Sequence, residues 1–125
     1  AKAADALLQG LAKTFSDNVF NFTHFAMMMW ATPAAFPEVA LSDLFSSEGV
    51  NALEAIFSKK CMHAAADTMN FAFGDAYKSF LKENPARSEQ WVKTLLDGSV
   101  PAVKPIAPVI IYWGTKDTVV PPVMG

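Results

Sequence analysis

The chain has 125 residues, of which 52% are hydrophobic and 18% charged, and its formal net charge at pH 7 is -2. This apolar content is sufficient for one folded domain of ordinary size and excludes a disordered chain. Lysines and arginines form no basic stripe along the sequence, so nucleic acid is not an expected partner.

The cysteine count and the first residues of the chain exclude certain disulfides, metal sites and targeting signals. A single cysteine, Cys61, excludes a disulfide within the chain and a cysteine-rich metal site, so any disulfide partner lies outside it. The first residues show neither a basic region leading into an apolar run nor a cleavage pattern, so they carry no targeting signal. We interpret the chain as an internal part of a longer protein.

The first part of the chain has the pattern of a series of helices. Apolar residues that include Ala4, Leu8 and Phe15 recur three and four positions apart and predict an amphipathic helix. Capping residues at 16–18 begin a second, far more apolar helix, which we expect to end near Pro33. Polar residues interrupt this stretch, whereas a membrane span needs about 20 predominantly apolar residues. We therefore assign it to a buried or lid helix, with a membrane-surface role as the alternative.

Further helix starts follow along the chain. One is predicted at Pro37, because proline suits the first turn of a helix, and another at the capping residue Ser46. The helix from Ser46 is expected to end near Lys59, where cations favour the C-terminal end of the dipole. A later helix is expected over about residues 64–71, and Gly74 is expected to break it.

The helical region is expected to end where the amino-acid composition changes. Pro85 stops the preceding helix, and a last short helix is predicted with Trp91, Leu95 and Leu96 on one face. Prolines then become frequent, as is typical of a connector. We divide the chain accordingly into a helical cap or lid domain (1–100), a proline-rich connector (101–107), and a core strand with an acid loop (108–125).

The predicted strand is the β-branched and aromatic run at 109–113. Such a continuous apolar run is typical of a strand buried on both faces of a parallel sheet. A single strand cannot make a sheet, so we expect its partner strands outside this chain. Its open edge also predicts pairing between chains, as a homodimer.

Asp117 has the clearest catalytic pattern in this chain. It follows the predicted strand by four residues, which places it on a loop at the carboxyl edge of a sheet. We expect Gly114 to permit a tight turn, and Val119, Val120 and Pro121 to pack the loop back down. A buried carboxylate held in this way would select the tautomer of a catalytic histidine and stabilise its imidazolium. The alternative is an aspartate that only caps a turn through nearby backbone N–H groups.

Several short motifs precede Asp117 in the sequence. They are Phe36-Pro37-Glu38, the run 41–49, Cys61, Asn84-Pro85, Trp91 with Leu95, and Pro105-Ile106-Ala107-Pro108. In this order, and with Gly-x-x-Asp and Val-Pro after them, they resemble the secretory lipase family of α/β-hydrolases. The resemblance covers roughly residues 25–122.

The resemblance implies a fragment of an α/β-hydrolase fold, with a mainly α-helical cap or lid domain followed by one core β-strand. Asp117 matches the acid of a Ser-His-Asp triad, whose serine is expected upstream of Ala1 and whose histidine is expected downstream of Gly125. The resemblance also implies a secreted or cell-envelope protein that acts on acyl esters or lipids, with a lipid interface as a further partner and no cofactor.

The sequence also predicts an apolar lining for the acyl group of the substrate. Phe25, Met28, Met29 and Trp30 are the candidates, because methionine side chains re-pack easily around a ligand. The alternative is that these side chains form ordinary core.

The chain's histidines fit poorly with catalysis or metal binding. His24 lies on the apolar helix, where a hydrogen-bonded core histidine is favoured over a catalytic one. His63 lies close to Cys61 in sequence, but one cysteine and one histidine without further ligands do not predict a metal site.

Two functions follow from the sequence. The first is the cap and triad-acid portion of a serine ester hydrolase of the lipase or carboxylesterase type, which is inactive without the serine and the histidine. The second is a non-catalytic helical module that binds a hydrophobic ligand or a partner protein. The strand and Gly-x-x-Asp pattern favour the first, because a binding module has no need of them.

Overall fold

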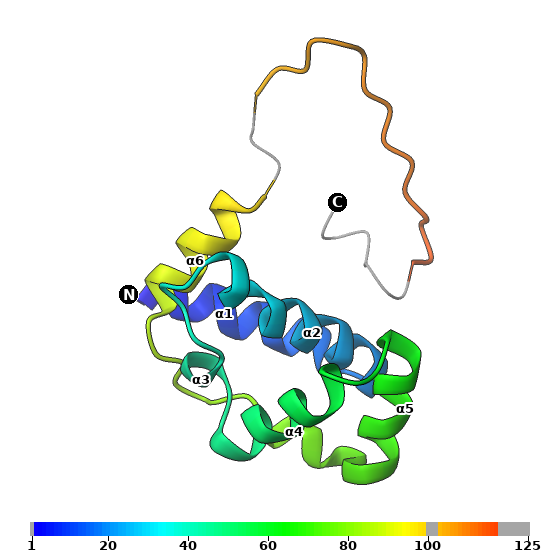
Figure 1. Ribbon diagram of the computed structural model, residues 1–125. Coiled ribbons are helices and arrows are strands. Elements are labelled where there is room, and N and C mark those ends of the chain that lie inside the picture. The colour runs from blue at the N-terminus through cyan, green and yellow to red at the C-terminus, as the bar shows by residue number, and fades with distance from the viewer. Residues whose placement is uncertain (1, 100–102, 118–125) are drawn as a thin grey trace.

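The computed structural model describes residues 2–99 and 103–117. Residues 2–99 form a bundle of helices, the helical body, and residues 103–117 form an extended tail that runs outside it (Figure 1). The helical elements are, in chain order, α1 (Lys2–Phe15), α2 (Val19–Ala35), α3 (Leu41–Leu44), α4 (Ser47–Phe57), α5 (Met62–Phe73), the 3₁₀ helix η1 (Gly74–Ser79) and α6 (Ser88–Asp97).

Helix α2 lies at the centre of the helical body. It packs against α1, α3, α4 and α5, while α6 packs on the other side of the bundle against α1 (Figure 1). Its sequence is apolar on nearly all sides, which is the pattern of a helix surrounded by others. Phe22, Ala26 and Met29 are fully buried on it.

Local sequence signals account for several helix ends. The Asn18 side chain accepts a hydrogen bond from the Asn21 N–H at 2.9 Å and caps α2. Ser46 caps α4 in the same way, with its Oγ 3.2 Å from the Gly49 nitrogen. Gly74, with φ +51°, ends α5 in a backbone conformation that side chains with a Cβ rarely adopt.

A buried carboxylate ties α3 to α6. Asp43 Oδ2 accepts hydrogen bonds from the Ala40 N–H at 2.9 Å and from the Trp91 indole at 3.1 Å. The Ala86 N–H also donates to the Asp43 backbone carbonyl at 2.8 Å. Trp91 is fully buried, so its indole N–H needs this partner inside the core.

Two details of the helices differ from the sequence-based expectation. The helix predicted to start at Pro37 begins instead at Leu41, where the Asp43 carboxylate bonds the Ala40 N–H at the helix start. Leu96 was predicted to share one face of the helix with Trp91, but Trp91 is fully buried and Leu96 is 65% exposed. At about 100° of rotation per residue, it lies about 140° around α6 from Trp91.

The predicted core strand at 109–113 is wrong for this chain. These residues are extended but pair with no other described residue, and the structure holds no strand in 2–99 or 103–117. The β-type pairing of the described residues is one antiparallel bridge, Phe45 with Leu81, inside the helical body. A strand requires a neighbour with unpaired backbone groups, and the helices already use theirs internally. The helical part of the predicted fold is consistent with the structure.

Candidate functional site

Asp117 lies in a turn at the end of the described tail. Its backbone N–H donates to the Gly114 carbonyl at 3.1 Å, which closes the turn. A Cβ added at Gly114 would meet the Asp117 Cβ at 3.7 Å, an ordinary contact, and Gly114 does not have a positive φ. The turn therefore forms without a conformation reserved for glycine. The predicted packing residues Val119, Val120 and Pro121 lie outside the described residues.

The chain's two histidines lie on helices rather than on the tail. His24, on α2, is half-buried, and its Nδ1 lies 3.0 Å from the Phe20 carbonyl, so Nδ1–H donates to it. Its ring also meets the Phe20 ring edge-on, with 4.5 Å between centroids. His63, on α5, also packs against Phe20, with 5.5 Å between ring centroids. His24 is hydrogen-bonded as predicted, but it is half-buried and not part of the core.

The four residues predicted to line an acyl site point to different sides of α2. Phe25 and Met29 are buried in the core, and half-buried Trp30 packs against Phe57 with 5.8 Å between ring centroids. Met28 is 53% exposed, so it alone of the four presents most of its side chain to the surface. Met28 thus faces the surface while Phe25 and Met29 face the core, so the four residues do not line one site together.

Met28 lies in a groove of about 360 Å³, which we call the Met28 groove. Its lining is Leu11, Met28, Thr32, Phe36, Thr94, Leu95, Gly98 and Ser99, from α1, α2, α6 and the segments that follow α2 and α6. The Thr94 hydroxyl is buried and has no hydrogen-bond partner among the described residues. Such orphaned polar groups are uncommon in native structures and mark places to search for a ligand or a bound water.

A second groove, the α1–α6 groove, has a volume of about 480 Å³. It is lined by Ala3, Ala4, Leu7, Glu89, Val92, Lys93, Leu96 and Asp97. Leu7 and Leu96 are both largely exposed in it, and Lys93 forms an ion pair with Asp97 along its rim. The sequence predicted neither groove, because each depends on how α6 lies against α1.

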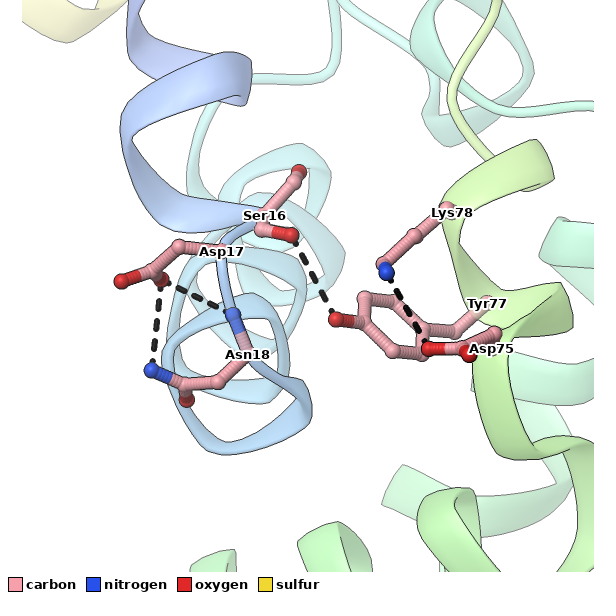
Figure 2. Close-up of polar contacts among 6 residues, drawn as sticks. All are labelled: Ser16, Asp17, Asn18, Asp75, Tyr77 and Lys78. Atoms are coloured by element: carbon pink, nitrogen blue, oxygen red, sulfur yellow. Dashed lines mark hydrogen bonds and ion pairs between the residues drawn. The ribbon is translucent and has the colours of Figure 1, made fainter.

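Figure 2 shows a polar cluster between the α1–α2 turn and η1. The Tyr77 hydroxyl points toward the Ser16 carbonyl and donates to it over 3.4 Å (Figure 2). Burial raises the pKa of Tyr77 above its ordinary value of 10.0, an effect that the positive charge of Lys78 opposes. Lys78 pairs with Asp75 at 3.1 Å, and this hydrogen bond raises the pKa of Lys78. The cluster joins elements distant in sequence and has no groove beside it among those described above.

Among residues 2–99 and 103–117, no group of three or more histidine, cysteine, aspartate or glutamate side chains is placed to hold a metal ion. None of the described helices is both long and apolar enough to cross a membrane. Cys61 is exposed at the start of α5.

Comparisons with known proteins give no relative for this chain. No protein family, curated protein or solved structure matches it.

Proposed function

We propose that this chain supplies the helical cap and the triad acid, Asp117, of a serine ester hydrolase of the lipase or carboxylesterase type. The observation that carries the proposal is the order of two features in the tail. An exposed apolar run at 109–113 leads directly into the turn that ends at Asp117. The resemblance of the sequence motifs to the secretory lipase family supports the same assignment.

In this proposal each part of the chain has a chemical task. The helical body forms the cap, and Asp117 accepts a hydrogen bond from the catalytic histidine. That histidine takes the proton of the attacking serine, which forms an ester with the acyl group and releases the alcohol. Both partners come from outside this chain, so the 125-residue chain alone has no esterase activity.

Labelling by a fluorophosphonate probe tests this proposal on a longer protein that contains the chain. We expect the wild-type serine to react, and Asp117→Asn to lower the labelling rate by roughly 10³- to 10⁴-fold while the protein stays folded. Asp75→Asn is the matched control, because Asp75 is a solvent-exposed acid paired with Lys78 and should leave the rate unchanged. Equal labelling of wild type and Asp117→Asn removes Asp117 from the triad. An unreactive wild type rejects the hydrolase.

A second function, a helical module that binds a hydrophobic ligand, is favoured by the Met28 groove. The groove combines an adaptable methionine, apolar walls and a buried hydroxyl, Thr94, that has no described partner. Few polar groups in a mostly apolar recess are typical of small-molecule sites.

Titration with the fluorescent fatty acid cis-parinaric acid tests this second function on the 125-residue chain. Met28→Lys should weaken binding, because it places a charge in the groove. Leu7→Lys, which changes the α1–α6 groove instead, is the matched control and should bind as the wild type does. Equal affinity of all three proteins excludes the Met28 groove as the site.

A further inference from the structure

The tail exposes a continuous apolar run. Val109, Ile110, Ile111, Tyr112 and Trp113 are 63%, 74%, 77%, 89% and 41% exposed. Single exposed apolar residues are common on protein surfaces, but contiguous ones mark an interaction site or an aggregation hazard. The run therefore calls for a partner that covers it.

The backbone of this run is open as well. No backbone hydrogen bond joins residues 109–113 to any other described residue. Extended segments with unpaired N–H and C=O groups pair with other extended segments, and β-branched and aromatic residues favour that pairing. A partner for this run must therefore offer backbone groups as well as apolar contact.

We propose that residues 109–113 pair with the same residues of a second copy of this chain, antiparallel, with Ile111 on the twofold axis. In this register Val109 lies opposite Trp113, Ile110 lies opposite Tyr112, and Ile111 lies opposite itself. Four of the five pairs thus join a β-branched residue to an aromatic one, a combination that stabilises antiparallel pairs. The run is complementary to its own reverse.

The flanking residues define the limits of the pairing. Pro108 lies opposite Gly114 in this register, and proline has no N–H to donate, so the ladder stops there. Lys116 lies opposite Ile106. A parallel, in-register pair would instead set Lys104 and Lys116 each beside its own copy, and like charges directly opposite are destabilising. Charge therefore favours the antiparallel arrangement.

Other occupants fit the run less well. A groove of the helical body can cover one face of an extended segment, but both faces of this run are exposed, and helices offer no unpaired backbone groups along their sides. A lipid interior leaves the backbone groups of a single extended segment unsatisfied. A second copy covers side chains and backbone together.

The strength of this association should be modest, because an isolated two-stranded pair is marginally stable in water. The proposal rests on the tail alone and does not depend on the proposed hydrolase. Sedimentation equilibrium of the 125-residue chain over a range of concentrations tests it. We expect wild type to dimerise reversibly and Ile111→Lys to associate on the order of 10- to 100-fold more weakly, because two charges meet at the axis.

Phe71→Lys is the matched control, since Phe71 is 95% exposed on α5 and lies outside the run. It makes the same kind of change at an exposed apolar position and should associate as the wild type does. If Phe71→Lys weakens association as much as Ile111→Lys does, general surface charge is the cause and the proposal fails.

A mixture of Ile111→Lys and Ile111→Glu tests the register. Each variant alone sets like charges opposite each other at the axis, whereas the mixture sets lysine opposite glutamate and should restore dimers. A mixture no more associated than its components overturns the pairing of Ile111 with itself. A monomeric wild type overturns the proposal outright, and if that monomer binds phosphatidylcholine vesicles, the run belongs to a lipid surface instead.

Discussion

The helical body and the tail contain the same kinds of apolar residue in opposite surroundings. Ile56 in α4 is 5% exposed, whereas Ile111 in the tail is 77% exposed. Trp91 is fully buried and donates its indole N–H to Asp43, whereas Trp113 is partly exposed. Residue type therefore does not decide burial in this chain.

Backbone hydrogen bonding explains the contrast. A helix satisfies its own N–H and C=O groups, so an apolar helix needs only side-chain contacts from its neighbours. An extended segment needs both a cover for its side chains and a partner for its backbone. Within residues 2–99 the helices cover one another's side chains. They offer no unpaired backbone groups with which the tail could pair.

Truncation of Trp91 is expected to break the helical body most severely. Trp91→Ala removes the largest fully buried side chain and one of the hydrogen bonds to the buried Asp43 carboxylate. We expect a loss of about 3–5 kcal/mol in the free energy of unfolding, measured by urea denaturation followed by far-UV circular dichroism. Leu96→Ala on the same helix, where the side chain is mostly exposed, should stay within about 0.5 kcal/mol of wild type. Similar losses for the two variants would contradict the packing of α6.

Two glycines on helices should respond in opposite directions to alanine. A Cβ at Gly49 would lie 2.9 Å from the Phe80 Cβ and 3.1 Å from its carbonyl oxygen, so Gly49→Ala should destabilise by about 1–3 kcal/mol. A Cβ at Gly10 in α1 would meet nothing within 4 Å, so Gly10→Ala should stabilise by about 0.5–1 kcal/mol. Urea denaturation of both variants provides the comparison. A gain in stability at Gly49 would rule out the close approach of α4 to Phe80.

The Tyr77 hydroxyl should give the helical body a dependence on alkaline pH. Burial raises the Tyr77 pKa in the folded state, so stability is fully present below pH 10.0 and falls as the unfolded phenol ionises first. Tyr77→Phe removes a long hydrogen bond to Ser16, so we expect a loss of about 0.5–1 kcal/mol at pH 7 and a shallower fall above pH 10.0. The measurement is the free energy of unfolding from pH 7 into the alkaline range. Parallel curves for the two proteins would show that Tyr77 is not the group responsible.

Features of the fold that depend on adjacent residues were predictable from the sequence. Ser46 was expected to cap a helix and does so through Gly49, because both partners lie within one turn. The exposure of Leu96 was not expected, although helical rotation sets it about 140° from Trp91. The later start of α3 was not expected either, because the Asp43 carboxylate that bonds Ala40 is also held by the distant Trp91 indole.

The candidate site likewise has features that the sequence predicted and features that it did not. The sequence predicted a turn at Gly114, and its closing bond to Asp117 lies within one short segment. It also predicted a buried carboxylate, whereas Asp117 is exposed. It grouped Met28 with Phe25, Met29 and Trp30, although α2 turns these residues to different sides. The position of Thr94 in the Met28 groove could not be predicted, because its surroundings come from three helices that meet only in the folded chain. The prediction of a strand was wrong because a local apolar run does not specify a partner strand.

The smallest expected effect is the sharpest test of the contrast between the two regions. Ile111→Ala should change the free energy of unfolding by less than about 0.5 kcal/mol, because the side chain contributes little to the packed body. Ile56→Ala removes the same atoms from the core and should destabilise by about 2–5 kcal/mol. Both are measured at protein concentrations below those at which the chains associate, so that pairing of the tails does not contribute. A large loss for Ile111→Ala under these conditions would mean that the tail packs on the helical body, and the division into two independent regions would then fail.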